Sequence, residues 1–234
     1  MRITKVFIIV SAFLFFNSTN ATTLLKRDFN AICSMADGVI QGVVHSVAHQ
    51  RNADGLIYRY IKLRDVNAIE GAIESSTITI RVVGGTIDDR TLAVIGSPEF
   101  IEGEEVILFV SDNDQRAVPF VGWGQGVFKV KKQNDKKVIT DSNGQAIVSI
   151  DNADIVKGHP LEIDDSGVLE PPHDSHFGGI AADGTPVTKV KFKTHRTSKQ
   201  PMLLGDFTTK IKSRVKSLKK SKPKKIIKSA VLKK

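Results

Sequence analysis

Two pairs of histidines have the type and spacing that could bind a metal ion. His45 and His49 are four positions apart, and His173 and His176 flank an aspartate and a serine. Converging imidazole and carboxylate groups are typical ligands of divalent transition metals. On one strand, however, His45 and His49 would be roughly 13 Å apart, too far for one ion without a bulge. His173 and His176 lie in a proline-rich stretch with no rigid supporting shell, so we expect a solvated loop there. Whether that loop binds a metal stays open.

Two further patterns match known motifs only in part. Asp112 and Asp114 begin like a calcium-binding loop, but Arg116 and Ala117 stand where that motif needs an oxygen ligand and a glycine. The glycines at 122, 124 and 126 differ from the dinucleotide-binding fingerprint, whose third glycine comes one residue later. We interpret the first pattern as a hairpin turn. The second is interpreted as a bent or closely packed strand.

The remaining reactive groups do not indicate catalysis. Cys33 is the single cysteine, which excludes an intramolecular disulfide framework and a cysteine-based zinc cluster. Its place at the start of a predicted strand favours a buried, structural thiol. Neighbouring carboxylates such as Glu104 and Glu105 face opposite ways in an extended chain, so they make poor acid–base pairs. The sequence lacks the motifs of serine hydrolases, zinc proteases and P-loop proteins. We therefore expect no enzyme, no cofactor and no resident metal.

The N-terminus has the pattern of a secretory signal peptide. Arg2 and Lys5 precede an apolar stretch over residues 6–16, and Thr19 and Ala21 supply the small residues of a cleavage site. We expect residues 1–21 to be removed by cleavage after Ala21. The mature protein is then secreted or periplasmic. No later apolar run approaches the roughly 20 residues that a membrane-spanning helix needs.

The charge of the chain is divided between two regions. The 234 residues have a formal net charge of +9. Residues 22–186 contain 15 Lys/Arg and 24 Asp/Glu, whereas residues 187–234 contain 17 Lys/Arg and one acid, Asp206. A basic tail of this kind is typical of segments that associate with anionic surfaces such as acidic lipid, lipopolysaccharide or nucleic acid. Only Phe192 and Phe207 could stack on bases, so we expect no specific nucleic acid.

The acidic body is predicted to consist of short strands separated by turns. Strands are expected at residues 38–48, 56–66, 77–83, 92–95, 105–110, 120–130, 138–139 and 145–150. The stretch 105–110 is almost continuously apolar, which predicts a strand buried on both faces. The strand spacing and scarcity of helices predict a mainly β fold, with a small closed or half-closed barrel over residues 22–150.

The C-terminal third is predicted to differ from the body. Residues 151–186 contain four prolines and many Asp, Gly and Ser residues, so we interpret them as an extended linker. Residues 187–234 form the basic segment, and a helix is expected over 204–218. Its apolar residues recur on one face: Phe207, Ile211, Val215 and Leu218.

Two alternatives are open for this helix. Its apolar face could dock on the acidic body, or it could lie at a membrane interface. The candidate residues for an anionic surface are the basic residues of the helix and of the run that follows: Lys210, Lys212, Arg214, Lys216, Lys219, Lys220, Lys222, Lys224 and Lys225.

Several segments resemble known families. Residues 29–42, FNAICSMADGVIQG, resemble the first barrel strand of netrin-like modules, the group that includes tissue inhibitors of metalloproteinases. Residues 58–71 resemble their second strand. The Gly84-Gly85 turn, the stretch 94–109 and GWGQGVFKV over 122–130 are similar to uncharacterised secreted bacterial proteins. The resemblance covers about residues 29–130 and implies a five-stranded barrel of the oligonucleotide/oligosaccharide-binding (OB) type.

The chain departs from those inhibitors at its predicted mature N-terminus. They have a Cys-x-Cys there, and the terminal amine and carbonyl chelate the zinc of the target protease. This chain has Thr22 and Thr23 instead, so that inhibitory mode is not carried over. A fold by itself does not determine function.

Three functions remain. We favour a secreted, non-catalytic binding protein whose barrel engages a protein partner while the tail associates with an anionic envelope surface. The alternatives are an inhibitor or accessory protein of a secreted metalloprotease, and a hydrolase of an envelope polymer. The candidate partner-binding residues are Trp123, Gln125 and Phe128, because interface energy concentrates in a few large side chains. Any of them that is buried is to be counted as core.

Overall fold

The computed structural model describes residues 25–161, 200–218 and 226–230, and these residues form a mainly β fold. Two α-helices are α2 (Phe29–Met35) and α3 (Leu204–Leu218), and a short 3-10 helix is η1 (Trp123–Gly126). The strands are β1 (Gly38–Arg51), β2 (Ile57–Glu70), β3 (Ala72–Ile73), β4 (Ile78–Val83), β5 (Gly85–Ile87), β6 (Arg90–Leu92), β7 (Glu105–Val110), β8 (Val127–Gln133), β9 (Lys136–Asp141), β10 (Gln145–Asp151), β11 (Asp154–Pro160) and β12 (Ile226–Ile227).

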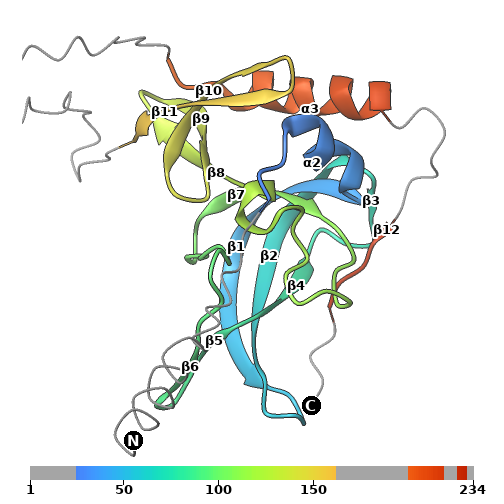
Figure 1. Cartoon of the computed structure of the whole chain (residues 1–234), viewed down its shortest axis with the longest axis vertical. Coiled ribbons are helices and arrows are strands. Elements are labelled where there is room, and N and C mark those ends of the chain that lie inside the picture. The colour runs from blue at the N-terminus through green and yellow to red at the C-terminus, as the bar shows by residue number, and fades with distance from the viewer. Residues whose placement is uncertain (1–24, 162–199, 219–225, 231–234) are drawn as a thin grey trace, which may run out of the picture.

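Eight strands form one antiparallel sheet in the order β11-β10-β9-β8-β7-β1-β2-β4 (Figure 1). β1 pairs with β2 on one side and with β7 on the other. The order β7-β1-β2-β4 is that of a Greek key, in which the fourth strand returns to lie beside the first. Register shifts between Val39 and Ser46 mark bulges in β1, which bend and twist a sheet.

The sheet is not closed into a barrel by hydrogen bonds. β4 and β11 are the two edges of the eight-stranded sheet, and no ladder among the described strands joins them. The mainly β prediction is therefore confirmed, but the predicted closed barrel is not found in the described ranges. A smaller two-stranded sheet joins β5 and β6, and another joins β3 and β12.

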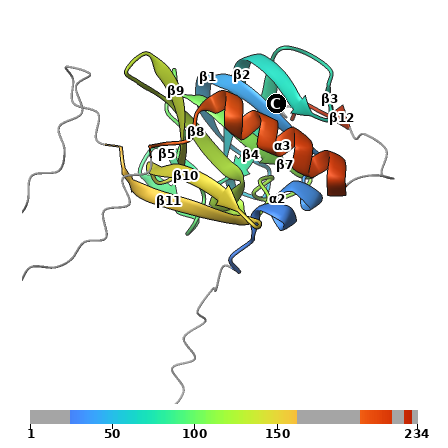
Figure 2. The ribbon, with the colours of Figure 1, turned by 90° about the horizontal axis from the view of Figure 1, so that it is seen from above.

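β7 is buried on both faces, as its apolar sequence predicts. Ile107 and Phe109 face a core that α2 and α3 cover, whereas Val106 and Leu108 face a second core beside β1, β2 and β4. Four phenylalanine rings interlock in the first core with centroid separations from 4.9 to 6.2 Å: Phe29, Phe109, Phe128 and Phe207. Figure 2 shows α2 and α3 beside each other above the sheet.

α3 occupies the predicted range and docks on the body. Phe207, Ile211 and Val215 are at most 1% exposed, while Leu218 is 42% exposed. The segment before the helix is fixed by the sheet, because the Met202 N–H donates to the Ile147 carbonyl. The docked alternative is therefore correct for the apolar face. No helix in the described ranges is long and apolar enough to cross a membrane.

The stretch predicted as one bent strand over 120–130 contains a turn instead. Gly122 and Trp123 both have φ of 61°, a left-handed conformation that interrupts an extended chain. η1 follows, and β8 begins only at Val127. The predicted strand at 92–95 is also wrong for most of its length, since only Leu92 belongs to a strand.

The predicted linker begins with a strand. β11 lies within residues 151–186 and pairs with β10 through a two-residue turn at Asn152 and Ala153. Both turn residues have positive φ, as tight hairpins require. Pro160, which donates no hydrogen bond, stands at the end of this edge strand, where proline is tolerated. The rest of the predicted linker, from 162, lies outside the described residues, as do residues 1–24 with the predicted signal peptide.

Candidate functional site

A strained turn at residues 122–126 contains two of the three candidate partner-binding residues, Trp123 and Gln125. A φ of 61° is uncommon for a bulky aromatic residue such as Trp123 and costs free energy. At Gly126 a Cβ would lie 2.5 Å from the Val121 carbonyl oxygen, so only glycine fits without a shift of the backbone. Strain of this kind persists only where the surrounding structure holds it, and it is concentrated at functional sites.

The side chain of Gln125 holds an extended segment of backbone. The Arg27 N–H donates to Gln125 Oε1 at 2.7 Å, and Gln125 Nε2 donates to the Leu25 carbonyl at 3.0 Å. One amide group therefore both accepts and donates, and it binds the two residues on either side of Lys26, as a residue of a neighbouring parallel strand does. Leu25 itself is 67% exposed. The segment is therefore held by its backbone rather than by burial of its first side chain.

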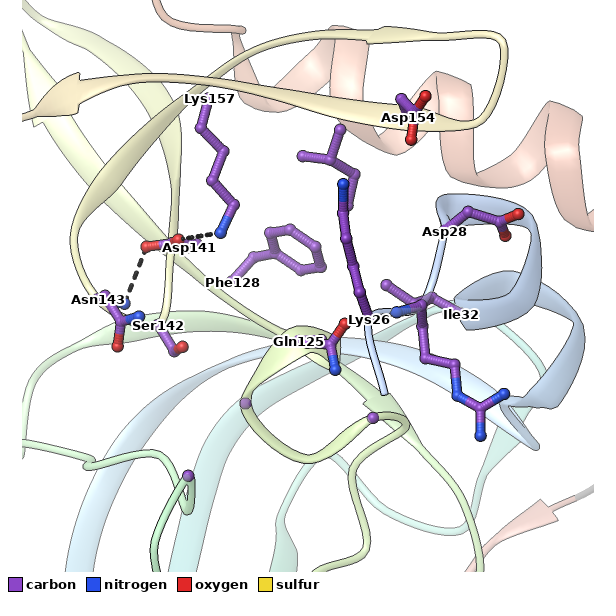
Figure 3. A pocket seen from close by; sticks show the side chains of 15 residues that line it. Lys26, Asp28, Ile32, Gln125, Phe128, Asp141, Ser142, Asn143, Asp154 and Lys157 are labelled. Carbon is purple, nitrogen blue, oxygen red and sulfur yellow. Dashed lines mark hydrogen bonds and ion pairs between the residues drawn. The ribbon is translucent and has the colours of Figure 1, made fainter. Parts of the chain in front are cut away.

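A cleft of about 240 Å³ lies beside this contact. Its apolar floor includes Ile32 and Phe128, which are at most 1% exposed (Figure 3). Its other lining residues come from the segment 26–28, Gly96, the turn at 122–125, the turn between β9 and β10, and the start of β11. The Phe29 N–H donates to the Ala153 carbonyl at 2.8 Å, which joins the N-terminal segment to the turn before β11.

Two carboxylates of the cleft, Asp141 and Asp28, have structural partners. Asp141 Oδ1 accepts the N–H groups of Asn143 and Gln145 at 2.9 Å, and Oδ2 accepts Lys157 Nζ at 2.7 Å (Figure 3). Asp28 caps α2 by accepting the Ala31 N–H. The cleft therefore combines an apolar floor with charged groups of both signs, which suits a polar backbone with one apolar side chain.

The three sequence-predicted partner residues have different positions. Gln125 lines the cleft. Phe128 also reaches its floor, but it is 1% exposed and packs against Phe109 and Phe207, so it is a core residue. Trp123 is half-buried and packs against the second core, and it is not among the residues that line the cleft.

Sequence reasoning missed most of the rim. Lys26, Asp28, Asp141 and Lys157 are separated by up to 131 positions and meet only because β11 returns beside the N-terminal segment. The strands predicted at 138–139 and 145–150 imply a turn over Asp141-Ser142-Asn143-Gly144, and this turn is the sequence signal for that part of the rim.

The outer side of α3 is basic. Lys210, Lys212 and Lys216 are exposed and Arg214 is half-buried. Lys210 also lines an open hollow of about 720 Å³ between the helix and the segment before it. The other candidate tail residues lie outside the described residues: Lys219, Lys220, Lys222, Lys224 and Lys225.

Glu104 forms an ion cluster that is not part of the cleft. Its carboxylate accepts Lys129 Nζ at 2.9 Å, Lys131 Nζ at 3.3 Å and the Ile101 N–H at 3.1 Å. Burial alone would raise the pKa of Glu104. The hydrogen bonds from Lys129, Ile101 and Lys131 and the charge of Lys129 outweigh that effect, so the pKa lies below its ordinary value.

Of the candidate metal ligands, the structure describes His45 and His49, and neither belongs to a metal-binding group. His49 Nδ1 lies 2.7 Å from the Thr86 carbonyl, a backbone partner. Within residues 25–161, 200–218 and 226–230 there is no group of three or more His, Cys, Asp or Glu residues that could hold a metal. His173 and His176 lie outside these ranges. Cys33 is buried in the first core, as expected for a structural thiol.

Comparison of the chain with models of known protein families, with curated proteins and with solved structures finds no match.

Proposed function

We propose that this chain is an exported, non-catalytic binding protein. It engages an extended segment of a protein partner at the cleft beside Gln125, and its basic C-terminal segment associates with an anionic surface of the cell envelope. The Gln125 contact carries the first half of this proposal. A site whose side chain already holds Leu25 and Arg27 by their backbone groups has the chemistry to hold another extended polypeptide.

The N-terminal segment is held weakly enough to be replaced. Two hydrogen bonds at a part-exposed position contribute about 0.5–1.5 kcal/mol each. A partner strand that adds a side chain in the cleft gains apolar burial, which Leu25 does not. The volume of about 240 Å³ lies below the usual range for small-molecule sites, roughly 300–1,000 Å³, and suits a side chain better than a cofactor.

The first test is capture from the native secreted fraction with residues 22–234 as bait. Gln125→Ala removes the amide, and Gln115→Ala is the matched control because Gln115 is exposed on another turn. We expect one partner to be retained by the wild type and by Gln115→Ala. Gln125→Ala should weaken its binding roughly tenfold, the equivalent of about 1.4 kcal/mol for the two hydrogen bonds that the amide can make. Equal retention by all three baits would contradict the proposal.

The single tryptophan offers a second readout with purified components. Trp123 is half-buried on the same turn as Gln125, and it is the only Trp of the chain. Titration with the captured partner should change its emission in the wild type and in Gln115→Ala. In Gln125→Ala the same change should require a higher partner concentration.

The second half of the proposal is supported by the exposed lysines of α3. We expect the full mature chain to bind vesicles that contain acidic lipid at low salt and to be released at about 0.5 M salt, where screening is strong. Lys212→Glu with Lys216→Glu should abolish binding. Lys132→Glu with Lys136→Glu, an equal charge change on the β8–β9 hairpin, should leave most of it. Equal loss in both pairs would attribute the binding to net charge and contradict a tail-specific role.

We extend the proposal to the architecture. The pairing order β8-β7-β1-β2-β4, with β1 paired on both sides, supports a partly open OB-like module of the netrin-like type. The inhibitor alternative is an outcome of the same capture experiment. A metalloprotease retained by the wild type and lost by Gln125→Ala would favour it over a general binding role.

A further inference from the structure

The two most exposed large apolar side chains of the described residues lie beside the cleft. Ile95 is 86% exposed and Leu25 is 67% exposed, the highest values among the large hydrophobic residues in the described ranges. Gly96, which follows Ile95, and Lys26, which follows Leu25, both line the cleft. Single apolar residues are ordinary on a protein surface, whereas apolar residues gathered around a cleft mark an interaction site.

Ile95 stands at the tip of a tight turn in the loop between β6 and β7. The Ser97 N–H donates to the Val94 carbonyl at 3.0 Å. Gly96 has φ of 80°, the left-handed conformation that a type II β-turn requires at its third residue. The second residue of such a turn points its side chain away from the loop, which agrees with the exposure of Ile95.

This turn packs against the strained turn at residues 122–126. A Cβ at Gly124 would lie 3.3 Å from the Gly96 carbonyl oxygen and 3.1 Å from Ser142 Oγ. All three of these residues line the cleft. The backbone of one turn therefore meets the backbone of the other at the cleft, and Ile95 is the next residue along the chain.

A buried arginine fixes the turn that presents Ile95. Arg59 is 5% exposed, and its Nη2 donates to Ser97 Oγ at 2.7 Å while its Nη1 donates to Glu99 Oε2 at 2.7 Å. Phe100, the next residue, is buried in the second core. A turn held in this way keeps Ile95 in one place before a partner arrives, so that less conformational entropy is lost on binding.

We propose, on the basis of the cleft function proposed above, that Ile95 is a second apolar contact for the partner segment and that Arg59 is its positioning residue. The partner is then an extended polypeptide with two apolar side chains. One fills the cleft over its floor at Ile32 and Phe128, and the other covers Ile95. Burial of apolar surface is the main favourable term in association, and an isoleucine fixed in water supplies such surface.

The lining of the cleft favours a polypeptide as the occupant. Gly96, Gly122 and Gly124 carry no side chain, so another backbone can approach closely there. Gln125 beside them makes the hydrogen bonds that an extended backbone needs, since its amide both donates and accepts. The surface of Ile95 continues that of the cleft through Gly96, so one segment reaches both.

Random heptapeptides displayed on phage test the Ile95 contact with a defined probe. The bait is the full mature chain, and we expect it to enrich peptides with two apolar residues at a constant spacing. The consensus peptide is then synthesised and titrated against variants. Ile95→Asp should bind it roughly tenfold more weakly or worse, as expected for an apolar contact that is lost at an interface.

Ile101→Asp is the matched control for Ile95→Asp. Ile101 is 63% exposed on the same loop, but neither it nor its two neighbours in the chain line the cleft. Its affinity for the consensus peptide should stay within about twofold of the wild type. Both isoleucines are exposed, so both variants should keep the wild-type midpoint of urea denaturation.

Gln125→Ala distinguishes failure of this contact from failure of the cleft proposal. A consensus peptide that binds Gln125→Ala weakly but binds Ile95→Asp as tightly as the wild type would overturn the Ile95 contact alone. A consensus with only one apolar residue would do the same. If the wild type enriches no sequence, the cleft proposal and the Ile95 contact are both overturned.

Ser97→Ala tests the positioning role of Arg59, because it removes one acceptor of the guanidinium and leaves Ile95 in place. We expect it to weaken binding of the consensus peptide about threefold, through coupling between the turn and the second apolar residue. A peptide with alanine in place of that second apolar residue should bind Ser97→Ala and the wild type equally. Equal losses for both peptides would mean that Arg59 supports the fold in general, and would overturn its positioning role.

Discussion

Two carboxamide side chains hold two distant segments of this chain, and they do so with different consequences. Gln125 binds the backbone of Leu25 and Arg27, and Asn113 binds the backbone of Lys228. Both amides stand on turns with left-handed residues: Gly122 and Trp123 in one case, Asp112 and Asp114 in the other. Both segments are therefore held by the same kind of contact, a side-chain amide that binds backbone groups.

The two places differ in what is buried beside the amide. Leu25 is 67% exposed, whereas Ile227 is 2% exposed within a core and belongs to the C-terminal segment Ile226–Ala230, here called the strap. Hydrogen bonds at the surface contribute little net stability because water replaces them, whereas a buried isoleucine has no such replacement. We therefore interpret the N-terminal segment as replaceable by a ligand, and the strap as a fixed part of the fold.

Truncation of the buried anchor should have the largest effect. Ile227→Ala is expected to lower the free energy of unfolding by roughly 2–5 kcal/mol, because it leaves a cavity in the second core. Ile226→Ala, one position away and largely exposed, should stay within about 0.5 kcal/mol of the wild type. Urea denaturation measures both. Similar losses in the two variants would mean that the strap contributes through its backbone alone.

Replacement of the Asn113 amide should have a smaller effect. Asn113→Asp keeps an acceptor for the Arg81 N–H but places a carboxylate against the Thr79 and Lys228 carbonyl oxygens. The loss of two donated bonds should cost roughly 1–3 kcal/mol. Amide hydrogen exchange at Ala230, whose N–H is bound by Thr79, should speed up more than exchange in β7. Unchanged protection at Ala230 would show that Asn113 does not hold the strap.

The equivalent change at Gln125 should be weaker still. Gln125→Glu keeps the acceptor for the Arg27 N–H and loses the donor to the Leu25 carbonyl. We expect less than about 1 kcal/mol of lost stability, because the contact is part-exposed. Protease cleavage at Lys26 or Arg27 should nevertheless become faster. A loss of stability as large as that of Asn113→Asp would refute the contrast between the two segments.

The smallest expected effect is on the pH dependence of stability, and it should not involve either segment directly. The pKa of Glu104 is lower in the folded protein than in the unfolded chain, so its contribution to stability is fully present above the unfolded value of about 4.5. That contribution is lost as the pH falls through the folded pKa. Glu104→Gln should therefore be less stable than the wild type at pH 7, and the difference should shrink below about pH 4.

The carboxamides provide the control for this acid effect. Gln125 and Asn113 do not titrate, so protection of Arg27 and Ala230 should persist over the same acid range as long as the body stays folded. Loss of their protection before the global transition would indicate a titrating partner.

Elements with a strong local pattern were predictable from the sequence. β4 alternates in burial and β7 is apolar throughout, while α3 repeats its apolar residues at helical spacing. β11 was missed because its glycine and proline resemble a linker, although an edge strand tolerates both. η1 was missed because its turn requires a left-handed backbone at Trp123, a conformation that tryptophan rarely adopts. The sequence therefore suggested a bent strand instead.

The strap and the cleft could not be predicted because their partners are far apart in the chain. Thr79 and Ser229 are 150 positions apart, and Arg27 and Gln125 are 98 positions apart. Within the sequence, Ile226 and Ile227 are only two apolar residues in a basic run. Only the folded sheet shows that one of them is an anchor and the other is surface.

The 150-residue separation between the strap and β4 has a consequence for the order of folding. Contacts that close so long a loop are entropically costly and tend to form late, after the hairpins of β1, β2 and β4 have paired. An interaction that is absent from the rate-limiting barrier slows unfolding without speeding folding. Ile227 should therefore act as a kinetic latch: its loss would shorten the lifetime of the native state while leaving the refolding rate almost unchanged.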